Sequence, residues 1–79
     1  MKDELRRFIF GELIYSADSD RFGDDDDLLE AGLDSMGIMR LVMFVEQTFR
    51  VTLPDTEIEP DNVRTLTALE QWILRSRNP

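Results

Sequence analysis

One stretch of the sequence, residues 38–49, carries an apolar pattern with a helical period and constrains the fold most strongly. Its apolar residues recur three or four positions apart, so they share one face of a helix: Ile38, Leu41, Val42, Val45 and Phe49. The turn-like segment Gly32-Leu33-Asp34-Ser35-Met36 comes just before it. Asp and Ser are both favoured at a helix start, because a side-chain oxygen there accepts an orphan backbone N–H. We therefore expect a helix over about residues 35–50, with Ser35 at the positive end of its dipole, where an attached phosphate would be stabilised.

The rest of the chain predicts two longer helices and one short one. Residues 3–15 place four apolar side chains on one helix face: Leu5, Phe8, Ile9 and Leu13. Residues 66–76 do the same with Leu66, Leu69, Trp72 and Ile73. A short helix is expected near residues 58–63, with Pro60 at its start and Ile58 and Val63 as its apolar anchors. The expected fold class is all-α: a small four-helix bundle of three main helices plus one short helix.

A long loop, residues 16–34, is expected between helices one and two. It holds eight acidic residues against one Arg, and a loop of this length in a small domain is either functional or disordered. The simplest interpretation of the four Asp at positions 24–27 is a solvated, self-repelling run, and the alternative is cation binding or partner docking. Four apolar residues are expected to tie the loop to the bundle: Phe22, Leu28, Leu29 and Leu33. On this interpretation the loop is loosely held at low salt.

Composition excludes several classes of function. The net charge of −8 argues against nucleic acid, which requires a basic surface. The chain contains no Cys and no His, so neither a thiolate metal site nor a Ser–His nucleophile is expected, and the only Lys is Lys2. No catalytic residue and no metal ligand is therefore predicted. No apolar segment reaches the length of a signal or a membrane span, so we expect a cytoplasmic protein that does not bind membranes.

Residues 27–36, Asp27-Leu28-Leu29-Glu30-Ala31-Gly32-Leu33-Asp34-Ser35-Met36, together with the following helix, resemble the attachment site of the acyl and peptidyl carrier proteins. The resemblance extends over roughly residues 3–75. It implies that residues 1–79 form a single carrier domain and that Ser35 carries 4′-phosphopantetheine, whose thiol holds an acyl group. It also implies that Asp34 orients the site and engages the phosphopantetheinyl transferase. That enzyme takes the arm from coenzyme A and uses its own magnesium ion.

The same resemblance implies the other partners of the chain: an acyl- or aminoacyl-loading ligase or transferase, and the downstream biosynthetic enzymes that accept the loaded carrier. The carrier itself then catalyses nothing, and we expect it to be a monomer. In fatty-acid carriers the second helix is commonly acidic, whereas here Gly37 and Arg40 occupy positions that are often acidic. The segment around Ser35 looks closer to carriers of polyketide, nonribosomal peptide or aminoacyl pathways.

A set of residues on the second helix lies nearly opposite its apolar face at 100° per residue: Met36, Met39, Arg40, Met43 and Gln47. Met is a flexible contact residue that suits a surface for several partners, so this face is predicted to bind partners. The alternative is that the helix is buried on most sides and the Met side chains belong to the core. A different function also stays open at this stage: an unmodified helical interaction module that uses the same face.

Overall fold

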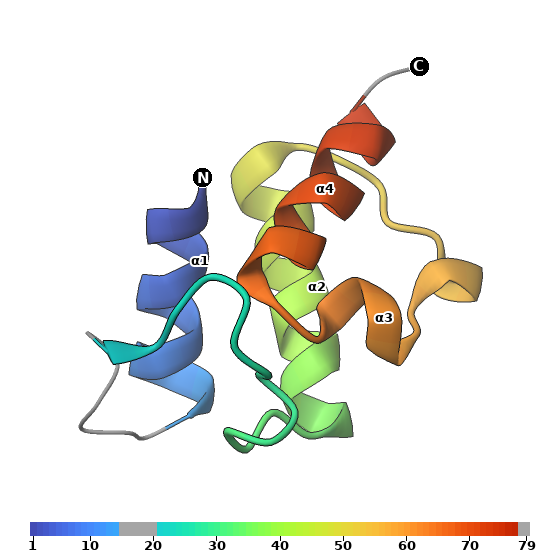
Figure 1. Ribbon diagram of the computed structural model, residues 1–79. Helices are drawn as coiled ribbons and strands as arrows, with labels where there is room; N and C mark the ends of the chain where they lie inside the picture. Colours follow the sequence, from blue (N-terminus) through green and yellow to red (C-terminus); the bar gives the residue numbers. More distant parts are fainter. Residues whose placement is uncertain (15–20, 78–79) are drawn as a thin grey trace.

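The computed structural model describes residues 1–14 and 21–77, and these form a compact bundle of helices (Figure 1). The described elements are α1 (Lys2–Phe8), the π-helical turn η1 (Ile9–Leu13), α2 (Ser35–Phe49), the 3₁₀ turn η3 (Asp55–Glu57), α3 (Pro60–Val63) and α4 (Leu66–Arg77). Neither described range contains a β-strand. The all-α, four-helix fold predicted from the sequence is therefore confirmed.

The first helix changes its geometry before it ends. After α1 the backbone continues as η1, and the Ile14 N–H donates to the Ile9 carbonyl at 2.7 Å, a bond that spans five residues and widens the turn. Ile14 is extended, with φ −124° and ψ 115°, so helical structure stops at Leu13. The helix was expected over about residues 3–15, of which Tyr15 lies outside the described residues.

The connection between α2 and α4 contains two short helical turns. The expected helix near residues 58–63 is α3, which begins at Pro60. Proline is pre-organised for the first helical position and holds the residue before it extended, and Glu59 has φ −142° and ψ 160°. Ile58 therefore precedes α3 and lies half-buried against the core. The sequence analysis did not anticipate η3.

The core lies where α1, α2 and α4 meet, and it is closed by the connecting segments. The Leu66, Leu69, Trp72 and Ile73 face of α4 is buried as predicted, and so are Leu5, Ile9, Leu41, Val42, Val45 and Val63. Ile38 and Phe49 are only partly buried at the margin. The indole N–H of Trp72 donates to Glu57 Oε1 at 2.8 Å, which satisfies the one polar atom of that side chain.

The acidic run meets solvent, as expected, and it also takes part in the fold: Asp25 and Asp26 are exposed, whereas Asp24 and Asp27 are half-buried. Its self-repulsion stays a prediction. Asp24 pairs with Arg6 at 2.9 Å and with Lys2 at 3.5 Å, and its carbonyl accepts from the Thr67 N–H at 3.1 Å. Asp26 Oδ2 accepts from the Gly23 N–H at 2.7 Å. The four expected apolar anchors do contact the bundle: Leu28 and Leu33 are buried, and Phe22 and Leu29 are half-buried. Residues 16–20 of the loop lie outside the described residues.

The two ends of the described chain lie far from the start of α2. Met1 and the last residue of α4, Arg77, are at one end of the bundle, whereas Ser35 begins α2 at the other end (Figure 1). None of the helices in residues 1–14 and 21–77 combines the length and the apolar character that crossing a membrane requires.

Candidate functional site

Asp34 and Ser35, at the start of α2, have different roles. Asp34 is the N-cap residue: its backbone is extended, and its Oδ1 accepts from the Gly37 N–H at 2.8 Å. Ser35 follows as the first helical residue and is exposed. Within the described ranges, no group hydrogen-bonds to the Ser35 hydroxyl. Capping, the ordinary reason for a serine at a helix start, therefore does not explain Ser35, because Asp34 already provides it.

The segment before Asp34 is a single, well-closed turn. Asp27 Oδ1 accepts from the N–H groups of Leu29 at 2.8 Å and Glu30 at 3.2 Å, as a capping side chain does. At the other end of the turn, Gly32 has φ +122°, and its N–H donates to the Leu29 carbonyl. The Leu33 N–H donates to the Leu28 carbonyl, which completes a Schellman arrangement. Leu33, the last residue of the turn, is buried and directly precedes Asp34 and Ser35.

Gly37 lies in a closely packed position. A Cβ at this position would stand 3.0 Å from Leu33 Cδ1 and 3.3 Å from Asp34 Oδ1. Gly37 is buried, so it is not a surface position from which an acidic side chain is simply missing. The lack of a side chain lets Leu33 and the Asp34 cap lie against the first turn of α2. Gly37 therefore contributes to the local packing that positions Ser35.

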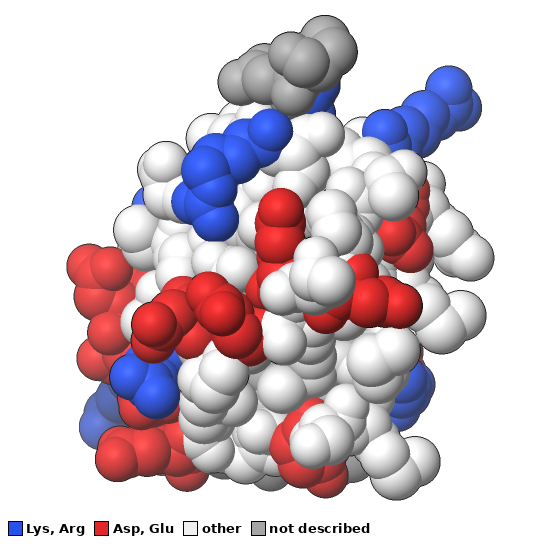
Figure 2. All heavy atoms as spheres, turned by 90° about the vertical axis from the view of Figure 1, so that its right-hand side faces the viewer, with Lys and Arg blue, Asp and Glu red and all other residues white. Residues whose placement is uncertain are grey.

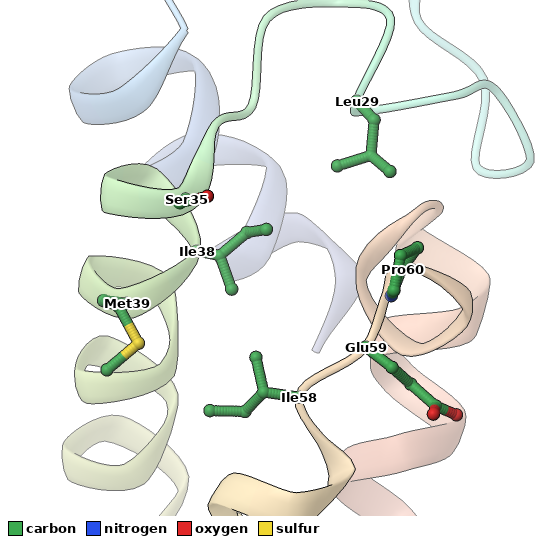
Figure 3. A pocket seen from close by; sticks show the side chains of 7 residues that line it. All are labelled: Leu29, Ser35, Ile38, Met39, Ile58, Glu59 and Pro60. Atoms are coloured by element: carbon green, nitrogen blue, oxygen red, sulfur yellow. The ribbon is translucent and has the colours of Figure 1, made fainter.

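An apolar pocket of about 300 Å³ opens beside Ser35. It lies between α2 and the segment that leads into α3, and Figure 3 shows Leu29, Ile38 and Ile58 pointing into it from three different segments. The Ser35 hydroxyl is on the side of α2 that faces this space, whereas the Glu59 carboxylate points away from it (Figure 3). Its complete lining is Leu29, Ser35, Ile38, Met39, Ile58, Glu59 and Pro60.

This pocket is not predicted from the sequence. By sequence, Leu29 and Ile58 are anchors of two separate connections, and Glu59 has no predicted role. The only signal in the sequence is that both connections carry apolar residues, among them Leu29 and Ile58, that belong to no long helical pattern. Which helix these connections approach depends on the tertiary fold.

The predicted partner face is exposed. Met36 is 77% exposed, Met39 51% and Met43 57%, and both Arg40 and Gln47 are exposed as well. The alternative in which the Met side chains are core residues is therefore wrong. Arg40 does have a neighbour, because its guanidinium lies 3.9 Å from Glu12 Oε2 and 3.4 Å from the Glu12 carbonyl.

The acidic side chains on this side of the molecule come from the connections and not from the outer face of α2. Figure 2 shows acidic side chains spread over the face that carries η3 and α3, with Lys and Arg at a few positions. The exposed acids of this connection are Asp55, Glu57, Glu59 and Asp61. On α2 the only acid is Glu46, and its Oε2 accepts from the Leu53 N–H at 2.9 Å. The described residues contain no group of three or more His, Cys, Asp or Glu arranged to hold a metal ion.

An exposed serine hydroxyl with no hydrogen-bond partner in the described structure, at a helix N-terminus, suits a covalently attached phosphate, because the helix dipole stabilises its charge. The neighbouring pocket offers apolar surface to a chain that leaves this point. These features agree with the sequence comparison: residues 7–73 match the family described as "Phosphopantetheine attachment site". The chain belongs to this family of phosphopantetheine-bearing carrier domains. Its prosthetic group is a covalently attached 4′-phosphopantetheine.

The proteins to which the chain is similar include aminoacyl and D-alanyl carrier proteins. The chain is 45% identical over 47 residues to aminoacyl carrier protein 2 of Bradyrhizobium diazoefficiens. The aligned region covers 60% of the chain and 53% of that relative. The chain is also 38% identical over 50 residues to the D-alanyl carrier protein of Streptococcus pyogenes. This aligned region covers 62% of the chain and 63% of that relative. In each comparison the chain spans less than two thirds of the relative's length.

A solved structure shares the fold. A chain in the crystal structure of Bradyrhizobium japonicum glycine:[carrier protein] ligase, complexed with its cognate carrier protein and an analogue of glycyl adenylate, superposes with a TM-score of 0.71. The superposition covers 94% of this chain and 91% of the other, at 23% sequence identity. This likeness independently supports the four-helix carrier fold.

Proposed function

We propose that this chain is an acyl carrier protein in which Ser35 bears the 4′-phosphopantetheine arm, and that its cargo is an aminoacyl or related acyl group held as a thioester. The observation that carries the proposal is the division of labour at the start of α2: Asp34 caps the helix, and the exposed Ser35 hydroxyl has no hydrogen-bond partner among the described residues. The family match supports the arm, and the similarity to aminoacyl and D-alanyl carrier proteins supports an aminoacyl cargo.

The priming step needs only a hydroxyl from this chain. Ser35 Oγ forms a bond to the phosphorus of coenzyme A that carries pantetheine, and the bond from this phosphorus to the bridging oxygen of the pyrophosphate breaks. The adenosine bisphosphate half of coenzyme A leaves with the electron pair, and the hydroxyl proton passes to a base of the transferase. This chain contains no His to act as that base. We therefore assign the catalysis to the transferase and none to the carrier.

The proposed partners are a phosphopantetheinyl transferase, an adenylate-forming ligase that loads the cargo, and the enzymes that accept it. The exposed Met36, Met39 and Met43 face, with Arg40 and Gln47, is the proposed docking surface for them. We propose a specialised pathway rather than fatty-acid synthesis, because α2 offers no acidic docking face. A single carrier domain that acts as a cytoplasmic monomer fits this function, since coenzyme A supplies the arm there.

Intact mass after incubation with coenzyme A and a promiscuous phosphopantetheinyl transferase tests the proposal. The wild-type chain and the control variant Ser76→Ala should each gain one phosphopantetheine group, and Ser35→Ala should gain none. Ser35→Ala should remain folded, because the cap belongs to Asp34 and Ala is a strong helix former. A mass gain in Ser35→Ala would move the attachment site elsewhere. A wild-type chain that gains nothing would favour the unmodified interaction module.

A further inference from the structure

We propose that Asp27, which does not contact Ser35, is a positioning residue for the priming reaction: its capping hydrogen bonds set the turn that holds the Ser35 hydroxyl in place. This inference rests on the proposed function of Ser35. It concerns a residue of the acidic run for which a merely solvated role was expected, and it assigns that residue a specific effect on the transfer step.

Asp27 and its neighbour Leu28 join the turn to the connection between α3 and α4. Oδ1 accepts from the Leu29 and Glu30 N–H groups at 2.8 and 3.2 Å, and Oδ2 lies 3.8 Å from Arg64 Nε. The Leu28 N–H, next in the chain, donates to the Arg64 carbonyl at 2.6 Å. The side chain of Asp27 is 33% exposed. It therefore fixes the start of the turn against the connection between α3 and α4.

The turn that begins at Asp27 ends directly at the site. Its last residue, Leu33, is 5% exposed and lies against Gly37 in the first turn of α2, where no Cβ would fit without displacing it. Asp34 and Ser35 follow Leu33 with no intervening residue. Leu29, whose N–H is capped by Asp27, forms one wall of the pocket beside Ser35. A loosened turn would therefore move both the serine and the pocket wall.

Group transfer is sensitive to such movement. The Ser35 oxygen must approach phosphorus in line with the bond that breaks, and a misplacement of about 1 Å costs on the order of a hundredfold in rate. The proposed docking face on α2, by contrast, does not include Asp27. Loss of the Asp27 cap should therefore lower kcat of the transferase for this carrier while KM changes little, whereas loss of docking contacts raises KM.

Three substitutions separate the cap from the charge of Asp27. Asp27→Ala removes both. Asp27→Asn keeps a short side-chain oxygen that can cap the turn but loses the negative charge that faces Arg64. Asp27→Glu keeps the charge but places it one methylene further out, away from capping geometry. Asp25→Ala is the matched control, because Asp25 is exposed and neighbours Asp27 in the same acidic run.

The experiment measures kcat and KM of priming with coenzyme A and the promiscuous transferase, at a temperature where circular dichroism shows every variant folded. Asp27→Ala and Asp27→Glu should lose on the order of tenfold or more in kcat with KM within about twofold, and Asp27→Asn and Asp25→Ala should match the wild type. Exchange of the Leu33 amide hydrogen should be faster in Asp27→Ala and Asp27→Glu than in Asp27→Asn.

Two results would overturn this assignment. One is wild-type kcat in folded Asp27→Glu, and the other is an Asp27→Asn that is as slow as Asp27→Glu, because either would separate the rate from the capping hydrogen bonds. If Asp27→Ala does not fold, the Asn and Glu pair still decides between these outcomes. Failure of the proposed function is a different result: the wild-type chain would then not be primed at all, or Ser35→Ala would be.

Discussion

The acidic connection between η1 and α2 and the outer face of α2 differ from what their compositions suggest. The connection is highly charged, yet Asp24, Asp26 and Asp27 each hold part of the chain in place. The outer face of α2 is largely apolar, yet Met36, Met39 and Met43 lie in solvent. In this molecule charged residues organise the structure around the site, and the exposed apolar residues form the surface that we propose for docking. Composition alone assigns these two roles the wrong way round.

The physical reason is that each connection has to provide hydrogen-bond partners for its own backbone. A connection has no helical ladder to pair its N–H and C=O groups, so short carboxylates such as Asp26 and Asp27 serve as local acceptors. A helix pairs its own backbone, so its outer face can carry any side chain without loss of local structure. The outer face of α2 is therefore the region that can be apolar and exposed at little cost in stability.

The largest expected difference between the two regions is in the free energy of unfolding. Leu33→Ala, in the acidic connection, should destabilise the protein by about 2–5 kcal/mol, because Leu33 is 5% exposed. Met43→Ala, on α2, should change stability by no more than about 0.5 kcal/mol, because Met43 is 57% exposed. Urea unfolding followed by circular dichroism measures both. Equal losses would mean that the Met face is buried in solution.

A second difference concerns the two glycines that lie in helical segments. Gly11→Ala should stabilise by up to about 1 kcal/mol, because nothing lies within 4 Å of the new Cβ and Ala is the better helix former. Gly37→Ala should instead destabilise by about 1–3 kcal/mol, since its Cβ would crowd Leu33 and the Asp34 cap. Melting temperatures of the two variants report the signs. A stabilised Gly37→Ala would show that Leu33 moves aside freely.

A smaller difference in stability is expected between substitutions of two neighbouring acids, Asp24 and Asp25. Asp24→Ala should destabilise by about 0.2–1 kcal/mol at low salt, because Asp24 pairs with Arg6 and Lys2 in a partly exposed site. Asp25→Ala should be neutral or slightly stabilising, because it removes one charge from the acidic run. At about 1 M salt the two variants should converge, since screening weakens exposed pairs. If added salt raises the wild-type melting temperature strongly, repulsion in the run outweighs these pairs.

The smallest expected effect is at Glu4, far from both regions. A hydrogen bond from the N-terminal ammonium, 3.0 Å away, lowers the pKa of Glu4 below its ordinary value of 4.5. A lowered folded-state pKa stabilises the fold above the unfolded-state pKa, and this contribution is lost as the pH falls through the folded-state pKa. N-terminal acetylation should return the pKa toward 4.5. An NMR titration of the Glu4 carboxyl measures this shift, and an unchanged pKa would exclude the pair in solution.

The helices and their buried faces could be predicted from the sequence. The period of Leu41, Val42 and Val45 gave the buried face of α2, and the same period placed Met39 and Met43 outside it. The position of Ser35 at a helix start followed from the capping preferences of Asp and Ser. These inferences succeed because helical period and capping are local properties, which depend on residues a few positions apart.

The contacts between connections could not be predicted in this way. Asp24 meets Arg6, and Asp27 meets Arg64, across long stretches of sequence, so no local pattern pairs them. The pocket beside Ser35 likewise needs Ile58 to approach α2, which only the tertiary fold brings about. A charge run is therefore ambiguous until its partners are known, because the same aspartates suit a solvated loop and a capped turn.

The placement of the chain ends has a practical consequence for handling the protein. The N-terminus and the last turn of α4 both lie at the end of the bundle away from the start of α2 (Figure 1). A tag, a solid support or a fused domain joined at either end would leave the side that carries Ser35 open. With the arm on Ser35, as we propose, a carrier immobilised in this way would extend it outward from the support, so that soluble enzymes added in succession reach the same thiol.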